Sequence, residues 1–541
     1  MPERSVTPSK EFCYSELFLD FLNWKPSLEK YFSSQESLEV AAKLGQTKVD
    51  RNLLCDVLIR QNISFKAKPR TFKVIEKLRQ EDSLCIFTGQ QAGLYGGPLL
   101  TLYKAIGITK LARQLERELR RPVAPIFWIA ADDHDFNEIN HLFYCGHDGD
   151  IRKLHYDLPP TRKVPISEIR FDDSQAYELF VQDTRGALGL SDFTDELYTR
   201  LFAAYSFNNT LADAFGQYLL DILPDLGLIL FSPADKEIKT VSKGFFKHLV
   251  EGHFKLKESL EATSLSLKND GYHIQVEKKE SAVHLFFHNP ERIPIHFLND
   301  AYVVGEKTLG LTGLLDLIDK YPDKFSPDVL TRPLWQSFLF PVVAQMGGPS
   351  EIAYFSQIGK LFNLFNLVQP HYYPRPALTL VEKRQEELLE KYGLNLPDIT
   401  GDIENVVKRV TIQSFPKEIE AKIADFRAKF EDAYNEFFSV VRNYDDHLEP
   451  MGKQTYGKID FALNAFEKKI YDHHKQRMQS TRSQIYRLAS ALFPNSNLQE
   501  RSLNINQFIA KYGFGIVDFI IKNVDVGTIE HQIIYISEYQ S

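Results

Sequence analysis

The stretch LCIFTGQQAGLYGGPLLTLYKAIGITKLARQLERELRRPVAPIFWIAADDHDFNEINH, residues 84 to 141, decides the fold. A short apolar run, Leu84 to Phe87, enters a glycine cluster, which is how a buried parallel strand typically ends. A helix is predicted from Pro98, because a proline lacks the N–H that would be unpaired in a first helical turn. A second apolar strand, Val123 to Ala131, then leads into an acidic turn. This is one βαβ unit with polar clusters at the carboxyl ends of both strands, the edge where open α/β sheets bind ligands.

Composition excludes several classes of protein. The 541 residues can form more than one core, and 64 basic against 72 acidic residues give a net charge of −8, with no overall basic field for nucleic acid or anionic membranes. No run approaches the ~20 apolar residues of a membrane span, and the amino terminus lacks the apolar core of a signal peptide. Four cysteines form no C-x-x-C. We therefore expect a reduced, cytoplasmic protein that binds neither nucleic acid nor membranes.

A second unit of the same kind follows later in the chain. The apolar run Phe338 to Gln345 leads into Met346, Gly347, Gly348 and Pro349, and then into a helix. Further buried strands are predicted at Leu226 to Phe231 and at Asn366 to Val368. We expect the two glycine-rich units to be halves of one doubly wound sheet that faces a shared crevice.

The remaining segments suggest layers and insertions around this core. Residues 1 to 83 carry three helical patterns, and the alternation in YHIQVEKK, AVHLFFHN, IPIHFLND and AYVVG predicts a small antiparallel insertion. The predicted organisation is the first part of a Rossmann-like core with an N-terminal helical layer at 1–260, a small antiparallel β insertion at 261–315, the second part of the core at 316–385, a helical hairpin or coiled coil at 386–495, and a C-terminal segment that docks on the core at 496–541.

The hairpin carries a heptad seam. Apolar side chains alternate four and three residues apart in Ile419, Ile423, Phe426, Phe430, Ala433, Phe437, Val440 and Tyr444. At 1.5 Å per residue this helix would be roughly 45 Å long. The seam is too apolar to remain solvated, so it must pack on itself, on another subunit or on both.

The glycine loop from Gly89 to Pro98 has two interpretations. It is neither a Walker A loop nor G-x-G-x-x-G, and it could be only a tight turn between a strand and a helix. Glycines also let a backbone approach a ligand, and free N–H groups at a helix start favour anions. The adjacent amides favour binding, because an amide can both donate and accept hydrogen bonds. The candidate cofactor-binding residues are Gly89, Gln90, Gly93, Gly96, Gly97, Gly347 and Gly348, with Gln91 as a candidate catalytic residue.

The acidic turn offers general acid/base chemistry, a metal site or an acidic helix cap. If the turn opens a helix, His134, Glu138 and His141 fall on one face as a possible ligand set. The carboxylates could instead cap a helix amino terminus. We favour a polar wall of an active site, because placing so many titratable groups at the end of a buried strand costs free energy if they serve only to pack the fold. The candidate catalytic residues here are Asp133, His134 and Asp135.

A third group of candidates belongs to the second unit. Arg375 stands between two prolines on a stiff loop that suits an anion or an ordinary turn, and Arg332 could equally be a surface ion pair. The candidate substrate-binding residues are Arg332, Gln345, Glu351, Tyr354 and Arg375.

Four ordered stretches resemble one family: FTGQQAGLYGGPLLTLYK, WIAADDHDFNEIN, SPDVLTRPLWQSFLFPVVAQMGGPSEIAYFSQIGKLF and YYPRPALTLVE. Together, from about residue 80 to 385, they are similar to the bacillithiol biosynthesis cysteine-adding enzymes, a family of cysteine ligases. The resemblance implies an α/β, Rossmann-like core related to class I aminoacyl-tRNA synthetases and nucleotidyltransferases, with connecting-peptide insertions, a protruding coiled coil and a homodimer formed through the helical hairpin. The sequence departs from the synthetase signatures, because it has no H-x-G-H at Gln90 and Gln91 and no K-M-S-K-S.

The resemblance also implies a reaction, the joining of cysteine through its carboxylate to the amine of glucosaminyl-malate. Since a carboxylate resists attack by an amine, we expect activation as an acyl-adenylate or acyl-phosphate, with ATP or ADP and Mg²⁺ and no tightly bound metal. The nucleotide would lie in the main crevice or against the C-terminal segment. The glycine turns would hold phosphate, the acidic turn would handle protons or Mg²⁺, and Arg332, Arg375 and Gln91 would hold carboxylates. The alternatives are a nucleotidyltransferase-like enzyme acting on another small molecule and a non-catalytic coiled-coil scaffold.

Overall fold

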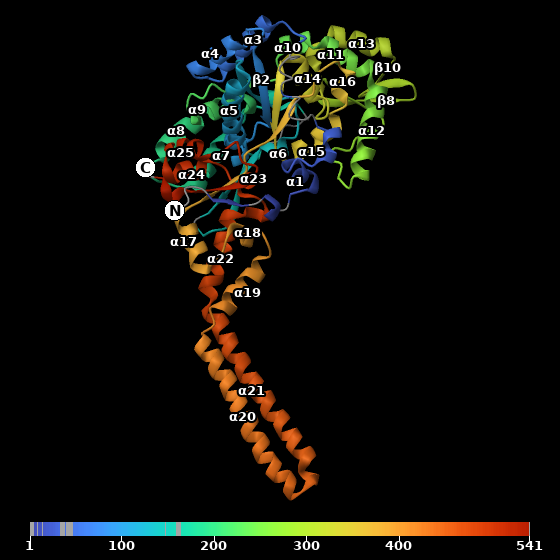
Figure 1. Ribbon diagram of the computed structural model, residues 1–541. Helices are drawn as coiled ribbons and strands as arrows, with labels where there is room; N and C mark the ends of the chain where they lie inside the picture. The colour runs from blue at the N-terminus through green and yellow to red at the C-terminus, as the bar shows by residue number, and fades with distance from the viewer. Residues whose placement is uncertain are drawn as a thin grey trace. The chain divides into compact units, whose positions relative to one another are not determined.

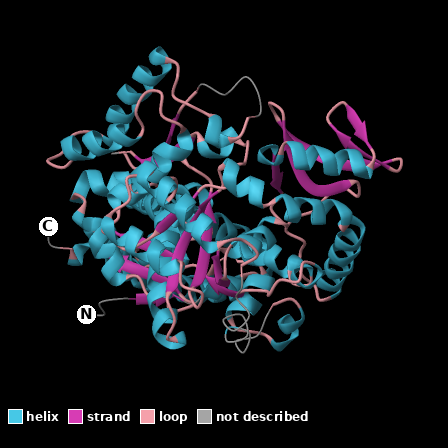
Figure 2. Cartoon of the chain, turned by 90° about the horizontal axis from the view of Figure 1, so that it is seen from above, coloured by secondary structure: helices cyan, strands magenta, loops and turns pink. Residues whose placement is uncertain are grey.

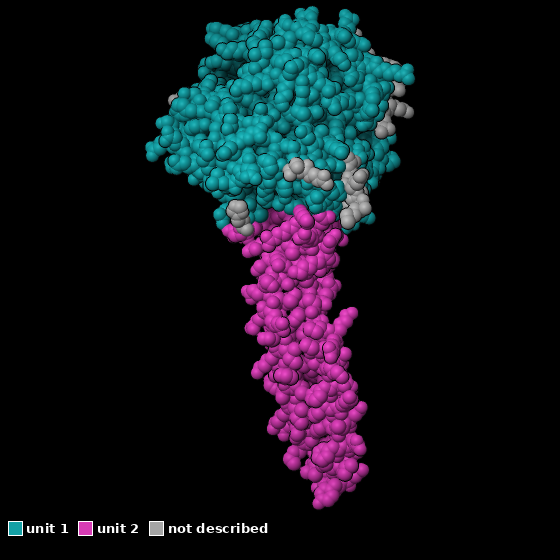
Figure 3. Space-filling model, turned by 90° about the vertical axis from the view of Figure 1, so that its left-hand side faces the viewer, with its two compact units in different colours: residues 1–147, 151–382, 497–541 teal, residues 148–150, 383–496 magenta. Residues whose placement is uncertain are grey.

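The computed structural model describes residues 5–7, 9–12, 14–32, 38, 47–146, 148–157 and 164–539. The chain forms two compact units (Figure 3). Unit 1 comprises residues 1–147, 151–382 and 497–541, and unit 2 comprises residues 148–150 and 383–496. Within the described residues, the helices are all too short or too polar to span a membrane.

A five-stranded parallel sheet forms the centre of unit 1, with its strands enclosed by helices (Figure 2). The strand order is β13-β12-β2-β3-β6, with bounds β2 Leu84–Gln90, β3 Val123–Ile129, β6 Ile229–Phe231, β12 Val342–Gly347 and β13 His371–Pro374. Side chains alternate between two cores: Leu84 and Ile86 face one, and Cys85 and Phe87 face the other. Burial on both faces explains why these strands are continuous apolar runs. The predicted Rossmann-like core is confirmed.

Helices cover both faces of this sheet (Figure 1). The long helix α5, Leu99–Leu119, connects β2 to β3 and packs on the same face as α9, Leu211–Ile222. The opposite face packs against α3 Arg51–Ser64, α4 Pro69–Leu78, α11 Lys243–Glu251, α14 Arg332–Leu339 and α15 Pro349–Ile358. The predicted helices at SELFLDFLNW and VDRNLLCDVLIRQN correspond to α1, Glu16–Leu22, and α3. The predicted helix LEVAAKLGQ lies mostly outside the described residues.

The remaining helices of unit 1 before β13 lie, in the sequence, between the strands and covering helices named above. They are α6 Phe136–Ile139, α7 Ser174–Leu188, α8 Thr194–Ala204, α10 Lys236–Val241, α12 His253–Asn269, α13 Leu311–Lys320 and α16 Leu361–Leu364. A two-stranded hairpin, β4 His141–Cys145 with β5 Ile151–His155, follows the acidic turn.

The C-terminal segment enters a small sheet of unit 1. β15, His531–Tyr535, pairs antiparallel with β1, Ser5–Thr7, and parallel with β14, Leu378–Val381. The helices before it are α23 Gln499–Ser502, α24 Asn506–Tyr512 and α25 Gly515–Asn523. The segment thus joins three distant parts of the chain.

A second antiparallel sheet forms the β lobe, seen as the separate group of strands in Figure 2. Its order is β10-β9-β8-β7-β11, with β7 Ala282–His288, β8 Arg292–Leu298, β9 Ala301–Val304, β10 Lys307–Leu309 and β11 Phe325–Pro327. The strand expected at Tyr272 to Lys279 is wrong, because this segment is a loop. Val276 forms both of its backbone hydrogen bonds with the side chain of Gln357 on α15.

One core strand also differs from expectation. The strand predicted at Asn366 to Val368 is wrong, and the chain there is irregular. The edge strand β13 instead uses the next residues, where His371 pairs with Ala344 of β12. Pro374 can end this strand because an edge strand need not use every N–H in the ladder.

Unit 2 is helical, and its hairpin pairs through only part of the predicted seam. Its helices are α17 Lys383–Tyr392, α18 Leu396–Ile399, α19 Ile403–Gln413, α20 Lys417–Tyr444, α21 Glu449–Arg477 and α22 Gln479–Leu492. The rings of Phe430 and Tyr434 on α20 contact Tyr456 on α21. The seam members Phe437 and Val440 are instead 66% and 65% exposed. The predicted seam therefore packs within the chain at Phe430, whereas its members Phe437 and Val440 remain exposed.

Candidate active site

Three strands of the central sheet bring polar side chains to one edge. Because β2, β3 and β12 are parallel neighbours, their carboxyl ends lie side by side. Gln90 ends β2, Asp132 and Asp133 follow β3, and Glu351 lies in the first turn of the helix after β12. The two glycine-rich units thus share one sheet edge, as predicted.

The first glycine loop is bonded within the protein. The Gly93 N–H donates to Gln91 O, the Gly96 N–H to the Tyr205 hydroxyl and the Gly97 N–H to Leu94 O. Gly96 and Gly97 have φ values of +86° and +72°, a left-handed conformation that disfavours other residues. The loop is a buried turn whose glycine amides already have acceptors, so these glycines do not form the predicted phosphate cradle in this structure.

The other candidate glycines are explained by close packing. A Cβ on Gly89 would lie 2.8 Å from Trp128 O, and one on Gly348 would lie 2.9 Å from Arg375 Nε. The Gly348 N–H donates to Glu351 Oε2 at 2.8 Å, and Gly347 O accepts from the Arg375 N–H. The second turn therefore also leaves little of its backbone for a ligand.

Lys104 joins the two turns. Its ammonium, only 3% exposed, donates to Gly89 O at 2.9 Å and to Gln90 Oε1 at 3.0 Å, and it lies 2.6 Å from Glu351 Oε2. Burial lowers the pKa of Lys104, although the charge of Glu351 opposes the shift. Glu351 and Gln90 are therefore held in fixed positions, and neither is a free substrate-binding group.

Asp133 is the most exposed of the bonded carboxylates at this edge. It accepts hydrogen bonds from Gln91 Nε2 at 2.9 Å and from the backbone N–H of His134 at 2.8 Å, and its side chain is 34% exposed. Burial by itself would raise the pKa of Asp133, but the Gln91 hydrogen bond and the charge of Arg292 outweigh it, so the pKa lies below its usual range. The structure thus brings Gln91, Asp133 and His134 together.

The rest of the acidic turn does not form the suggested metal ligand set. α6 is a single turn, with Asp135 and Glu138 exposed and His141 beyond it in β4, hydrogen-bonded to Asn140. Among the described residues no group of three metal-ligating side chains is found. The helical spacing on which the ligand set depended is interrupted before His141.

Asp132 has a buried partner that sequence reasoning missed. Lys239 Nζ lies 2.8 Å from Asp132 Oδ1, with side chains 4% and 11% exposed. Lys239 comes from α10, which follows the strand β6. Asp235 caps the start of α10 and pairs with Arg60.

The candidates of the second unit separate into two groups. Arg332 Nη2 donates to the Tyr354 hydroxyl at 2.7 Å, and Gln345 is buried against Gln336 Oε1 at 3.0 Å. Burial by itself would lower the pKa of Arg332, but Tyr354 and then the charges of Glu351 and Asp133 raise it above its usual value. Arg332 and Tyr354 therefore belong to the same edge as Asp133.

Arg375 belongs elsewhere. Its guanidinium lies 2.6 Å from Glu500 Oε1 with side chains 3% and 0% exposed, and it also donates to Pro376 O. Glu500 Oε2 accepts the N–H of Leu378, the first residue of β14. This buried pair joins the C-terminal segment to β14 and explains Arg375 without a ligand.

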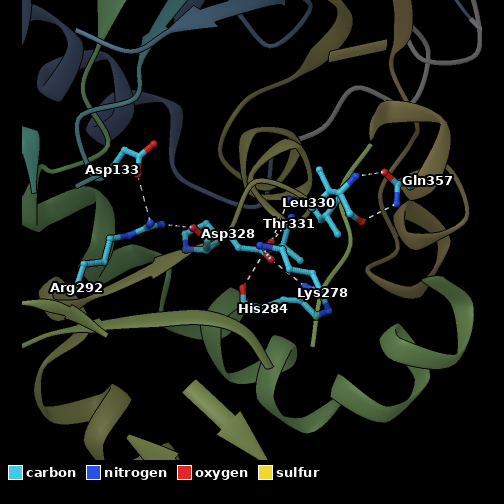
Figure 4. Close-up of polar contacts among 10 residues, drawn as sticks. Asp133, Lys278, His284, Arg292, Asp328, Leu330, Thr331 and Gln357 are labelled. Carbon is cyan, nitrogen blue, oxygen red and sulfur yellow. Dashed lines mark hydrogen bonds and ion pairs between the residues drawn. The ribbon is translucent and has the colours of Figure 1, made fainter. Parts of the chain in front are cut away.

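Arg292 of the β lobe is a further residue at the edge that sequence reasoning missed. It reaches toward Asp133 (Figure 4), with Nη1 3.6 Å from Asp133 Oδ1 and its side chain 10% exposed. Its guanidinium lies over the Phe286 ring at 3.7 Å. The only signal in sequence was an arginine at the start of an alternating strand, which is common on surfaces.

Fold and site together define a Rossmann-like α/β protein with a polar, mixed-charge sheet edge. The family model "Bacillithiol biosynthesis BshC, N-terminal Rossmann-like domain" matches residues 1–376, and "Bacillithiol biosynthesis BshC, C-terminal coiled-coil domain" matches residues 378–536. The chain belongs to the BshC family.

Relatives match over nearly the whole length. Proteins named "Putative cysteine ligase BshC" are 28% identical in Salinibacter ruber, over 97% of both chains, and 31% identical in Geobacillus kaustophilus, over 90% of both. Among solved structures, a "putative arginyl t-RNA synthetase" from Campylobacter jejuni aligns at 12% identity over 88% of this chain and 97% of its own, with a TM-score of 0.22, which is too low to establish a common fold.

Proposed function

We propose that this chain is a ligase that joins L-cysteine through its carboxylate to the amine of glucosaminyl-malate, the last step of bacillithiol biosynthesis. The family match across residues 1–376 and 378–536 carries the proposal. The sheet edge supports it, because cationic Arg292 and Arg332 lie near the ionised Asp133. Such an edge can hold a substrate with carboxylates and an amine.

The reaction requires activation of the cysteine carboxylate. We propose ATP with Mg²⁺ as co-substrate, forming an acyl-adenylate or an acyl-phosphate. Since the glycine amides are bonded within the turns, we propose that side chains rather than these amides hold the phosphates, and that Mg²⁺ arrives on the nucleotide. Cysteine-dependent exchange of pyrophosphate into ATP tests the adenylate, and ADP release tests the acyl-phosphate. Ligation with neither signal contradicts both.

The residues at the edge take distinct roles in this proposal. Asp133, kept ionised by Gln91, accepts a hydrogen bond from the substrate amine and orients it. His134, whose Nδ1 is 3.6 Å from Asp133 Oδ1, takes the proton that the amine loses, and Asp135 lies exposed beside them. Arg332 and Tyr354 bind a substrate carboxylate. Gln345, Glu351 and Arg375 support the fold around them.

We also propose a cytoplasmic homodimer formed through unit 2. The side of α20 that does not face α21 exposes Phe426, Phe437, Val440 and Tyr444, and Phe461 and Phe466 are exposed on α21. Continuous apolar side chains of this kind are rarely left in water. A second hairpin of the same sequence offers the same seam.

Product analysis tests the function. The purified chain, incubated with glucosaminyl-malate, cysteine and ATP with Mg²⁺, is expected to give the cysteinyl amide by mass spectrometry. A different activated product would favour the nucleotidyltransferase-like alternative. A scaffold would keep its biological role after Asp133→Asn and lose it after deletion of residues 417–477.

A further inference from the structure

His288, the last residue of β7, has a buried nitrogen without a partner among the described residues. Its Nε2 lies 2.8 Å from Ser326 Oγ, whereas Nδ1 is buried and has no hydrogen bond. Buried polar atoms are almost always bonded, so such an exception points to a missing ligand, water or ion. Burial, and next the charge of Lys239, lower the pKa of His288 to about 3, so the ring is neutral at physiological pH. Asp132 and His134 also influence it, which places the ring beside the turn after β3.

The hydrogen bonds around Ser326 indicate which nitrogen carries the proton. Arg292 Nε can only donate, and it donates to Ser326 Oγ at 3.4 Å. The hydroxyl hydrogen of Ser326 is then available for His288 Nε2, which must accept it. A neutral imidazole has one N–H, so Nδ1 becomes the donor. The other tautomer would leave the Ser326 hydrogen without an acceptor among the described residues.

Arg292 presents a second donor next to His288, one whose ion pair with Asp133 is too long for a hydrogen bond. The two residues are cross-strand partners in β7 and β8. Arg292 Nη2 donates to Pro327 O at 3.3 Å, but Nη1 lies 3.6 Å from Asp133 Oδ1, which is too far for a hydrogen bond. The Phe286 ring packs against one side of the guanidinium, and Nη1 faces the sheet edge in a long ion pair with Asp133 (Figure 4), without a hydrogen bond to it.

We propose that His288 Nδ1 and Arg292 Nη1 are a pair of donors that binds one carboxylate of the substrate beside Asp133. This assignment rests on the proposed function, in which the malate moiety supplies carboxylates. A nucleotide phosphate has similar chemistry, but one guanidinium and a neutral imidazole supply a single positive charge, which matches one carboxylate. Ionised Asp133 also repels a polyphosphate more strongly than a singly charged carboxylate. The β lobe thereby takes part in substrate recognition.

Two substitutions of the same histidine separate binding from support. In His288→Asn the side-chain amide lies near the Nδ1 position, whereas in His288→Gln it lies near Nε2 and can keep the contact with Ser326. Arg292→Lys keeps the positive charge but loses the planar set of N–H donors of the guanidinium. His296→Asn is the matched control in the same lobe, because His296 contacts Ser281. Isothermal titration of the full chain with glucosaminyl-malate, L-malate and ATP measures each affinity without requiring turnover.

We expect His288→Ala, His288→Gln and Arg292→Lys each to weaken binding of glucosaminyl-malate and L-malate about tenfold or more, with ATP affinity unchanged. His288→Asn should stay within about threefold of the wild type, and His296→Asn should match it. Rescue by glutamine but not asparagine, unchanged affinities throughout, or loss of ATP affinity alone would each overturn the proposal. The wild type could bind L-malate, with the losses expected in the His288 and Arg292 variants, and yet form no cysteinyl amide. That result would contradict the proposed function but support the pair of donors.

Discussion

Lys104 Nζ lies 2.6 Å from Glu351 Oε2, and this buried ion pair connects the turn after β2 to the turn after β12. Lys104 also bonds Gly89 O, and Glu351 accepts the N–H of Gly348. One pair thereby fixes the backbone at two of the three strand ends that form the candidate site. Glu351 thereby takes up the N–H of Gly348, and Lys104 takes up the carbonyl of Gly89.

Replacing Lys104 by methionine should therefore destabilise unit 1 strongly. The change leaves the Glu351 carboxylate, Gly89 O and Gln90 Oε1 without their shared donor, and breaking a buried pair from one side typically costs about 3–5 kcal/mol. Urea unfolding followed by tryptophan fluorescence measures the loss. Lys73→Met, at an exposed position on α4, is the control and should lie within about 0.5 kcal/mol of the wild type. Equal stability of the two variants would show that the pair contributes little.

Gln91→Leu should change the pH dependence of activity. The Gln91 amide helps to keep the pKa of Asp133 below its usual range, so its loss raises that pKa. If the reaction needs ionised Asp133, activity is present above this pKa and falls as the pH drops through it. The acidic limb of kcat/KM should therefore move to higher pH in the variant. A limb at the wild-type position would exclude this coupling.

Glu500→Gln and Arg375→Met should both act on stability and leave substrate affinity unchanged. Each leaves a buried group without its charged partner, at a cost of about 3–5 kcal/mol. The double variant should lose less unfolding free energy than the two single variants added together. Both single variants break the same ion pair, and in the double variant neither group is left with an unpaired charge. Chemical unfolding and titration with glucosaminyl-malate measure the two effects. A loss of affinity in folded Arg375→Met would restore Arg375 as a substrate-binding residue.

The double variant Phe437→Glu, Val440→Glu should be monomeric. Both side chains are exposed on α20, so the charges would be tolerated in the isolated hairpin but not when a second copy covers them. Light scattering after gel filtration measures the mass. Lys429→Glu, at an exposed polar position on the same helix, should leave the dimer intact. A wild-type chain that is itself monomeric at micromolar concentration would contradict the dimer.

The sheet could be predicted from sequence because its signals are local. Apolar runs such as Val123 to Ala131 and the glycine turns that follow strands are written in consecutive residues. The heptad pattern of α20 also marked a hairpin, but periodicity cannot tell which side of a seam faces the partner helix. The exposure of Phe437 and the contact of Phe430 with Tyr456 depend on the tertiary arrangement of α20 and α21.

The grouping of side chains at the sheet edge was predicted in part, because some of its signals are also local in the sequence. Gln91, Asp133 and His134 follow two strands that were already recognised as neighbours. Lys104 was hidden among the apolar residues of α5, and Arg292 belongs to a lobe that looked separate from the core. The buried pairing of Arg375 was missed because its partner, Glu500, lies 125 residues further along the chain, where no local pattern indicates the pairing.

The thiol metabolites of cells that lack this chain test the central claim most directly. Mass spectrometry of such cells should show accumulated glucosaminyl-malate and no cysteinylated product. The wild-type chain should restore the product, and Asp133→Asn, tested at equal protein level, should not. Normal amounts of the cysteinylated product in cells without the chain would contradict the assignment as the cysteine ligase.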